Sequence, residues 1–297
     1  MNALDKFAPL LSLTREPFPA STNTAIAGSR ADLRVPVRDV ALTNGEIVSL
    51  YDTSGPYTDP AVDIDVRRGL PDVLDPLTPT QVRDVPAPDQ GLLASPVVTQ
   101  VRGSVVQISG IASSCSRQID GSGFVYADER VMTNAHVLAG VTSPTVNAEG
   151  ESYDAVPVFV DEETDVAVLA VPGLPQVPLT FAAQPADSGA DAIIMGYPGG
   201  GGLYVGPARV RDRGDISGPD FRASQTVVRD VYALFGQVRA GNSGGPLLAT
   251  DGTVLGVVFA SAIDDPDTGY ALTGAQVAEA AAAGSTARTP VDTGPCE

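Results

Sequence analysis

One serine stands in a run of small residues that could support covalent catalysis. The run Arg239-Ala240-Gly241-Asn242-Ser243-Gly244-Gly245-Pro246 places nothing bulky beside the hydroxyl of Ser243, and its glycines allow the backbone to turn sharply. Backbone N–H groups in such a turn can converge on one point and stabilise an oxyanion. A serine hydroxyl becomes a strong nucleophile only when a neighbouring base removes its proton.

Histidine is the usual base for this task, and the 297-residue chain contains one histidine, His136. It lies in Met132-Thr133-Asn134-Ala135-His136-Val137. A lone histidine and a glycine-rich serine turn are each more often structural than catalytic. Here their order along the chain and their surroundings agree with catalysis, so we predict Ser243 as nucleophile and His136 as base.

A carboxylate is expected as the third member, because it fixes the tautomer of the histidine and stabilises the imidazolium. The acidic segment between residues 161 and 165 offers two aspartates. Asp165 immediately precedes the apolar run Val166-Ala167-Val168-Leu169, so its carboxylate can be anchored at the edge of a core. Asp161 lies on the far side of the acidic turn. We predict Asp165, with Asp161 as the alternative.

Chain order separates two folds that could carry this serine. The pattern Gly241-x-Ser243-x-Gly245 also fits the nucleophile elbow of α/β-hydrolases, which would make the protein an esterase. That fold requires serine, then acid, then histidine, and no histidine follows Ser243. The order His136, Asp165, Ser243 is that of the chymotrypsin-like double barrel.

The elements that must position these residues are predicted to be short strands. Runs rich in β-branched residues alternate with turns, which is typical of an all-β sandwich or barrel. The predicted strands are 104–111, 121–126, 130–134, 156–160, 165–171, 192–197, 203–210, 226–234, 246–248 and 254–259. One helix is predicted at residues 274–283, with Gly284 as its stop.

The domain organisation follows from where this pattern begins. Residues 1–94 are rich in proline and are predicted to form a mostly irregular N-terminal extension. Residues 95–297 are predicted to form one domain, with a first barrel at about 95–180, a second at about 181–273, and the C-terminal helix. A hydrophobic content of 43% is sufficient for a sizeable core.

Composition also argues against several classes of partner. The net charge of −18 and the pI of about 4.2 disfavour nucleic acid and anionic membranes. No apolar run approaches the roughly 18 residues of a membrane span, and no signal-peptide pattern is present, so the chain as given is expected to be soluble. One histidine and two distant cysteines do not make a zinc site, and the glycine run 199–202 lacks the lysine of a phosphate loop. We expect neither a metal nor a cofactor.

The two cysteines, Cys115 and Cys296, could be unrelated thiols or a disulfide. A free thiol at the penultimate residue would be exposed in a frayed tail. We therefore favour a disulfide, which implies an oxidising compartment.

The motifs Thr-Asn-Ala-His-Val, Thr-Asp-Val-Ala-Val-Leu and Gly-Asn-Ser-Gly-Gly-Pro-Leu resemble those of trypsin-like serine endopeptidases, in particular the bacterial HtrA-like branch. More narrowly, residues 123–137 and 254–270 are similar to the actinobacterial membrane-anchored periplasmic proteases related to the mycobacterial acid-resistance protease. The resemblance covers about residues 69–296. It implies two six-stranded barrels with the triad between them, a disulfide matching Cys115 and Cys296, and a membrane anchor domain that this chain lacks.

The resemblance also implies roles for other residues. The oxyanion hole would be formed by the N–H groups of Gly241 and Ser243, and Gln237 would lie at the base of the S1 pocket, so a basic P1 residue is not favoured. Gly269 would leave that pocket open. Phe259 to Ser261 would pair with the substrate backbone as an edge strand. Phe259 also replaces a hydroxyl that relatives often direct at the triad acid.

These observations predict a monomeric serine endopeptidase that acts on extracytoplasmic proteins or peptides. The resemblance implies a periplasmic, membrane-tethered setting and a role in cell-envelope stress or acid tolerance. An alternative from another class is a catalytically silent protease fold that serves as a binding module.

Overall fold

The computed structural model describes residues 83–112, 115, 117–262 and 265–296, together with the backbone of two strands. These strands, β1 (Asp39–Thr43) and β2 (Glu46–Tyr51), form an antiparallel hairpin. They belong to a compact unit, residues 1–66, that is distinct from the unit formed by the rest of the chain. Up to residue 82, the rest of the extension that was predicted to be irregular lies outside the described residues.

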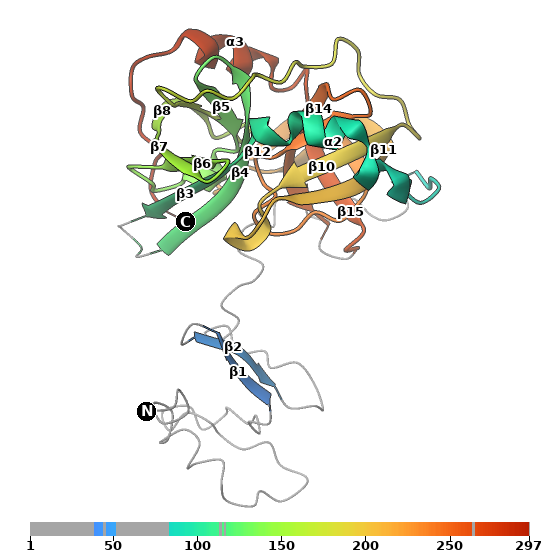
Figure 1. The fold of residues 1–297 in the computed structure, drawn as a ribbon, viewed down its shortest axis with the longest axis horizontal. Helices are drawn as coiled ribbons and strands as arrows, with labels where there is room; N and C mark the ends of the chain where they lie inside the picture. The colour runs from blue at the N-terminus through green and yellow to red at the C-terminus, as the bar shows by residue number, and fades with distance from the viewer. Residues whose placement is uncertain are drawn as a thin grey trace, which may run out of the picture. The chain divides into compact units, whose positions relative to one another are not determined.

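The first half of the second unit is an antiparallel sheet of seven strands in the order β7-β6-β3-β4-β5-β9-β8 (Figure 1). The strands are β3 (Val105–Ala112), β4 (Arg117–Ala127), β5 (Arg130–Thr133), β6 (Thr145–Ala148), β7 (Glu151–Asp154), β8 (Val156–Asp161) and β9 (Val166–Ala170). The resemblance implied six strands here, and the sequence pattern predicted five of them, so the sheet of seven has one strand more than implied. The structure adds the polar hairpin of β6 and β7, whose turn has positive φ at both Glu149 and Gly150.

The second half is a closed barrel with the strand order β10-β11-β12-β15-β14-β13. Its strands are β10 (Asp191–Gly196), β11 (Tyr204–Pro219), β12 (Thr226–Phe235), β13 (Pro246–Ala249), β14 (Val254–Ser261) and β15 (Thr268–Thr273). The expected chymotrypsin-like arrangement of two β-structures is therefore confirmed, and the α/β-hydrolase alternative is wrong.

Strand β11 is longer than its predicted counterpart, residues 203–210. Its first part pairs with β10 as far as Arg209, and its remainder pairs with β12 as far as Pro219 opposite Thr226. Because β12 meets β15 only from Val231 onward, the end of this hairpin is a two-stranded extension of the barrel. We call residues 212–230 the β11–β12 extension.

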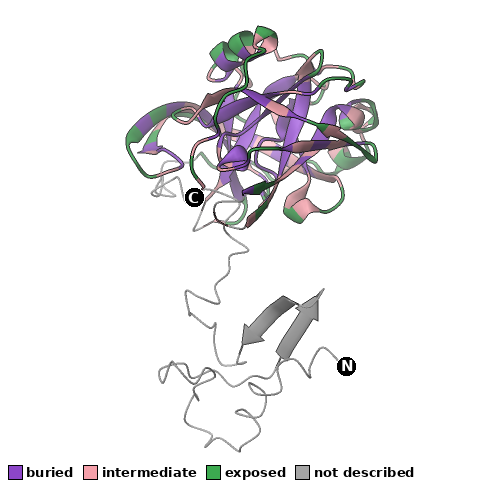
Figure 2. Ribbon diagram, turned by 90° about the vertical axis from the view of Figure 1, so that its left-hand side faces the viewer, coloured by how far each residue is buried: buried purple, intermediate pink, exposed green. Residues whose placement is uncertain are grey.

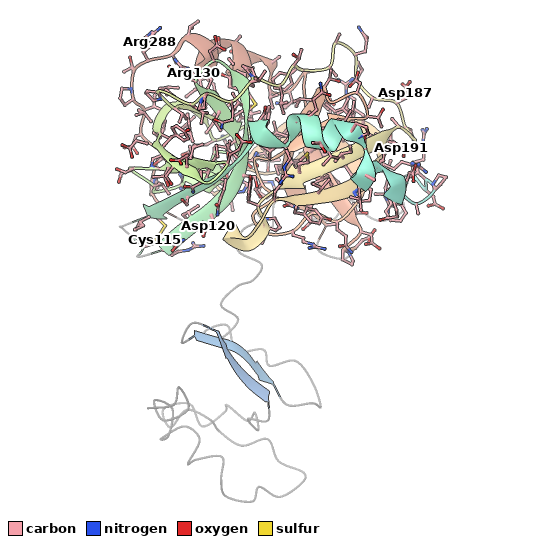
Figure 3. The ribbon with its side chains drawn as sticks, viewed as in Figure 1. Cys115, Asp120, Arg130, Asp187, Asp191 and Arg288 are labelled. Carbon is pink, nitrogen blue, oxygen red and sulfur yellow. A yellow bond between two sulfur atoms is a disulfide. The ribbon has the colours of Figure 1, made fainter. Side chains whose placement is uncertain are left out.

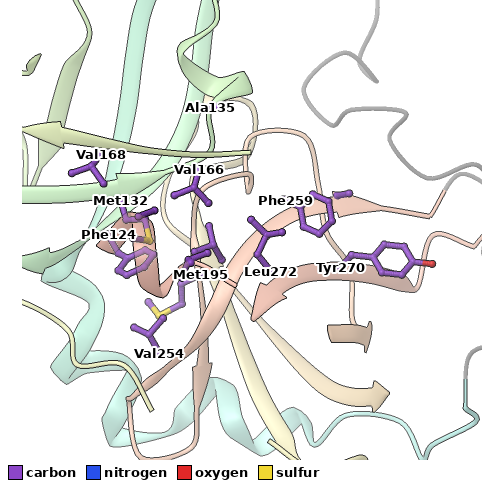
Figure 4. Packing of buried hydrophobic residues seen from close by; sticks show 14 of the residues in the cluster. Phe124, Met132, Ala135, Val166, Val168, Met195, Val254, Phe259, Tyr270 and Leu272 are labelled. Atoms are coloured by element: carbon purple, nitrogen blue, oxygen red, sulfur yellow. The ribbon is translucent and has the colours of Figure 1, made fainter. Parts of the chain in front are cut away.

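The hydrophobic core has one cluster within each half and a third that joins them (Figure 2). The shared cluster contains Phe124 and Met132 from the first half and Met195, Val254 and Phe259 from the second (Figure 4). All five side chains are fully buried. The two halves thus bury apolar surface against each other, which fixes their relative position.

The C-terminal helix α3 (Ala278–Thr286) lies against the first half of the unit, beside β5 and β8 (Figure 1). It starts four residues later than predicted and continues past Gly284, which was expected to stop it. Gly284 is buried in α3. It packs so closely on β9 that an added Cβ would lie 2.5 Å from Val168 Cγ2. The Nε of Arg130 also donates to the carbonyl of Gly284 at 3.2 Å (Figure 3). Close packing therefore explains this glycine better than helix termination does.

The predicted disulfide between Cys115 and Cys296 is present, with 6.3 Å between the Cα atoms. Cys115 lies in the turn between β3 and β4 (Figure 3), so the bond fastens the end of the chain to the first half. Hydrogen bonds also hold the tail to the first half, where Val291 N donates to Pro157 O at 2.9 Å and Thr293 Oγ1 donates to Val141 O at 2.9 Å. From the second half, Arg222 donates to the carbonyls of Thr293 and Pro295.

The other helical segments among the described residues are short. They are η3 (Gln90–Ala94), α2 (Pro96–Val101), η4 (Arg102–Ser104), η5 (His136–Leu138) and η6 (Pro198–Gly200). Helix α2 begins at Ser95, whose hydroxyl accepts from the Val97 N–H, and Pro96 occupies its first position. Within the part of the chain that the structure describes, no helix combines the length and apolarity that crossing a membrane would require.

Candidate active site

The neighbouring strands β5 and β9 bring His136 and Asp165 together. Thr133, at the end of β5, pairs with Ala167 near the start of β9, so the segments after β5 and before β9 meet at one edge of the sheet. His136 opens η5 on this edge, and Asp165 is the last residue before β9. The Nδ1 of His136 lies 2.7 Å from Asp165 Oδ2, and the backbone N–H of His136 donates to Asp165 Oδ1 at 3.0 Å.

Asp165 is held firmly in an uncommon backbone conformation. Its φ is +63°, in the left-handed region that non-glycine residues enter at a cost of order 1 kcal/mol or more. The side-chain amide of Asn134 donates to the Asp165 carbonyl at 2.7 Å, and the residue is only 1% exposed. The alternative, Asp161, instead accepts hydrogen bonds from the N–H groups of Glu163 and Thr164. It shapes the turn and does not bond to the histidine.

The orientation of the His136 ring leaves one nitrogen available. Because Nδ1 faces a carboxylate, it carries the proton in the neutral ring, and Nε2 is the acceptor. Nε2 is buried and has no hydrogen-bond partner among the described residues. The ring of Phe221 lies 6.4 Å from the His136 ring, centroid to centroid, and is tilted against it.

The serine turn lies between β12 and β13 of the closed barrel, and its glycines are required by close approaches. Gly241 has a φ of +93° and Gly244 a φ of +84°. A Cβ on Gly244 would overlap Thr133 Oγ1 and the Ser122 carbonyl, and would lie 3.1 Å from Asn134 N. The turn that carries Ser243 is therefore packed directly against the segment that leads into His136. Ser243 itself is 1% exposed.

Ser122, in β4, links this turn to the first half and was not singled out in the sequence. Its N–H donates to Ser243 O at 2.9 Å, and its hydroxyl donates to Gly241 O at 2.6 Å and accepts from Tyr197 N at 2.8 Å. Its carbonyl accepts from Thr133 Oγ1 at 2.7 Å. Ser122 is fully buried, so these bonds are shielded from water. The only sequence signal was its position between two glycines in an apolar strand.

Two of the residues expected to bind substrate, Phe259 and Ser261, lie at the end of β14. From Phe259 onward, β14 pairs with β15 but makes no further backbone hydrogen bond to the serine turn, whose last such bonds reach Val258. The Phe259 side chain is fully buried in the shared core (Figure 4), so only its backbone is placed for binding. Ser261 is half-buried at the strand end.

Gln237 and Gly269, which are expected to line the S1 pocket, each have a close side-chain neighbour. Gln237 is exposed, and its amide bonds to Asp267 at 3.4 Å and accepts from Arg239 at 3.2 Å. A Cβ on Gly269 would overlap Val238 Cγ2. Val238 therefore lies where a side chain on Gly269 would be.

Other features of the described residues lie apart from this site. No group of three or more histidine, cysteine, aspartate or glutamate side chains in the described ranges is placed to hold a metal ion. A cavity of about 400 Å³ is lined by the connector around Phe181, the barrel strands and α3. None of His136, Asp165 and Ser243 lines it, so this cavity is not the candidate site.

Chemically, the site combines an oriented imidazole with a serine held in a glycine-rich turn. The carboxylate of Asp165 holds His136 through two bonds, one to ring Nδ1 and one to the backbone N–H, and leaves Nε2 unbonded. Such an arrangement can accept a proton from a hydroxyl and return it to a leaving group.

Comparison with known proteins identifies similar sequences and structures. A family model of the trypsin-like peptidase domain matches residues 121–257, and a model of the ThiC-associated domain matches residues 17–77. The serine protease Rv3671c of Mycobacterium tuberculosis is 48% identical over 230 residues, which is 77% of this chain and 57% of that protein. The chain thus spans little more than half the length of this curated relative.

Solved structures extend the comparison. The active form of the Rv3671c protease has a TM-score of 0.72 at 48% identity, over 75% of this chain and 99% of that one. The inactive form has a TM-score of 0.62 at 47% identity, over 67% and 98% of the two chains. The HtrA-type protease AlgW with a tripeptide has a TM-score of 0.57 at 23% identity, over 64% and 62%, which supports the fold alone.

Proposed function

Because the chain belongs to the trypsin-like serine protease family, we propose that it is an endopeptidase whose chemistry is carried by Ser243, His136 and Asp165. The observation that carries this proposal is the two-point attachment of His136 to Asp165, at 2.7 Å and 3.0 Å, beside the turn that holds Ser243. A structural histidine has no need of a free, buried Nε2.

In the proposed mechanism, Ser243 Oγ attacks the scissile carbonyl while His136 Nε2 removes its proton. The imidazolium is stabilised by Asp165 and gives the proton to the leaving amine, so an acyl-enzyme remains on Ser243. Water then attacks the acyl group, with His136 again acting as base. Each proton taken from a nucleophile is returned to a leaving group.

Substrate recognition is proposed to use the backbone of β14 and the serine turn. The N–H groups of Gly241 and Ser243 would stabilise the oxyanion, which is consistent with the positive φ of Gly241. The edge of β14 from Phe259 to Ser261 would add the substrate as a further strand. Val238, beside Gly269, favours a shallow S1 pocket, and Gln237 supplies no negative charge for a basic P1 residue.

We further propose an extracytoplasmic, periplasmic setting and a role in cell-envelope stress or acid tolerance. The Cys115–Cys296 disulfide supports an oxidising compartment. The natural substrates would be proteins or peptides. The protease would act on them as a monomer tethered to a membrane.

The test is proteomic cleavage-site profiling of a denatured protein mixture. The wild-type chain should generate new N-termini with a shared, non-basic P1 preference, and Ser243→Ala should generate none above background. Identical profiles for the two proteins would contradict the proposal and favour a silent binding module.

A further inference from the structure

The β11–β12 extension reaches from the closed barrel to His136 and to the turn before Asp165, which belong to the other half of the unit. Phe221, at its end, lies against the His136 ring. Its neighbour Arg222 forms an ion pair with Glu162 at 3.0 Å, in the turn that leads to Asp165. One element of the serine half thus contacts both the base and the segment that carries the acid.

Arg229 is the most deeply buried charged residue of this extension, with 3% exposure. Its Nε donates to the carbonyl of Glu163 at 2.8 Å, and one terminal nitrogen donates to Pro219 O at 3.1 Å. The other terminal nitrogen is buried and has no partner among the described residues. A guanidinium remains charged in proteins, and burying such a charge is costly unless nearby groups compensate it.

The charges that face Arg229 come from two elements. Burial lowers the pKa of the Arg229 guanidinium, whereas Asp165 and Asp161, in the turn before β9, and Asp220, on the extension, raise it. Asp220 is already bonded by the backbone N–H groups of Arg222 and Ser224. Asp161 is likewise occupied by its own turn. Of these three carboxylates, Asp165 is the one that bonds to His136 and not to its own turn.

We propose that Arg229 is a positioning residue for the Asp165–His136 pair, which rests on the proposed function of that pair. Its hydrogen bond to Glu163 O fixes the chain two residues before Asp165, where the backbone must enter the left-handed region. Its permanent positive charge stabilises the Asp165 carboxylate. Removal of this charge would favour the imidazolium of His136, because a nearby positive charge disfavours a second one.

Two variants separate position from charge. Arg229→Gln removes the charge, and Arg229→Lys keeps it but supplies one ammonium in place of two hydrogen bonds directed at two carbonyls. Arg213→Gln is the matched control, because Arg213 lies on the same extension but pairs with Asp230 at its surface. The full chain, with its single histidine labelled with ¹³C, allows the titration of His136 to be followed directly by NMR.

The titration and the kinetics should change together in Arg229→Gln. The midpoint of the histidine titration and the acid limb of kcat/KM should both move to higher pH, and kcat should fall roughly 10- to 100-fold, as expected for a misplaced catalytic group. Arg229→Lys should keep the wild-type titration and still lose kcat. Arg213→Gln should match the wild type in both.

An unmoved or lowered titration midpoint in Arg229→Gln would overturn the proposal. If that variant does not fold, Arg229→Lys decides, because a wild-type kcat in it would overturn the positioning role. The NMR titration needs no catalysis. A wild-type chain without peptidase activity would therefore refute the proposed function, while the titration would still test Arg229.

Discussion

The two halves of the protease unit hold their parts of the site in different ways. The half that carries Ser243 is a closed barrel, in which every strand is hydrogen-bonded to two others, so it has little unpaired strand edge beyond the end of β14 after Val258. The half that carries His136 and Asp165 is an open sheet ending at β7 and β8. Open edges leave backbone groups unpaired and need cover.

The open half receives this cover from segments outside its own sheet. Helix α3 packs on it through Gly284, the tail bonds to Pro157 and Val141, and Arg229 bonds to Glu163 from the other half. Ser243 therefore lies on a sheet that closes on itself and is joined to the other half through Ser122. His136 and Asp165 depend in addition on the helix, the tail and Arg229. Changes at those supports should affect His136 and Asp165 before they affect Ser243.

The largest effect is expected from removing the contribution of either half to catalysis. Ser243→Ala or His136→Ala should each lower kcat on the order of 10⁶-fold, and the double variant should be little worse, because the residues act as one unit. Steady-state kinetics on a peptide substrate measures this. Additive losses in the double variant would mean that the two halves contribute independently.

Reduction of the Cys115–Cys296 disulfide should be the next largest effect, and it should fall on the open half. Loss of a native disulfide costs about 2–5 kcal/mol, a large share of a typical stability of about 5–15 kcal/mol. Melting with and without reductant measures the loss. Hydrogen exchange should increase first in β8 and at η5, near the tail contacts, and an increase confined to the closed barrel would contradict the comparison.

Ser122→Ala tests the joint between the halves. The variant leaves the partly buried N–H of Tyr197 without its acceptor and should lower the free energy of unfolding by about 1–3 kcal/mol. It should also lower kcat, because the carbonyl of Gly241 loses its donor. Ser188→Ala, which removes one exposed hydroxyl bonded to Arg211 O, is the control. Equal losses in the two variants would refute the special role of Ser122.

The smallest effect is expected in acid, at the end of the β11–β12 extension. Burial would raise the pKa of Asp220, but hydrogen bonds from Ser224 and Arg222 and the charge of Arg229 hold it below its usual value. A lowered folded-state pKa means that this stabilisation is present above the unfolded value of about 3.9 and is lost as the pH falls below it. The difference in Tm between the wild type and Asp220→Asn should narrow from pH 5 to pH 3. A difference that stays constant over this range would contradict the assignment.

Much of the apolar framework could be predicted from the sequence. Runs such as Val166 to Leu169 are buried because strand propensity and hydrophobicity agree there. Strand β7 and the end of β11 were missed, because Glu151-Ser152-Tyr153-Asp154 and residues 211–215 carry no apolar alternation. Strand β6 does alternate, but it has only four residues and was missed with its partner β7. These strands form through pairing with neighbours, which local sequence does not encode.

The residues of the candidate site likewise divide into those that local sequence could identify and one that it could not. His136, Asp165 and Ser243 were predicted because reactive residue types occur in distinctive local contexts. Arg229 could not be found this way, since its bond to the Glu163 carbonyl spans 66 residues and arginine in a polar strand is typical of a solvated face. The helix end at Gly284 was also wrong, because its close neighbour, Val168, is distant in the sequence.

Labelling with a fluorophosphonate probe is the most direct test that the two halves form one catalytic unit, since this reagent modifies activated serines. Peptide mapping of the labelled wild type should find the probe on Ser243 alone, and His136→Ala should remain unlabelled although its closed barrel is intact. Modification of a different serine, or equal labelling of Ser243 without His136, would contradict the account.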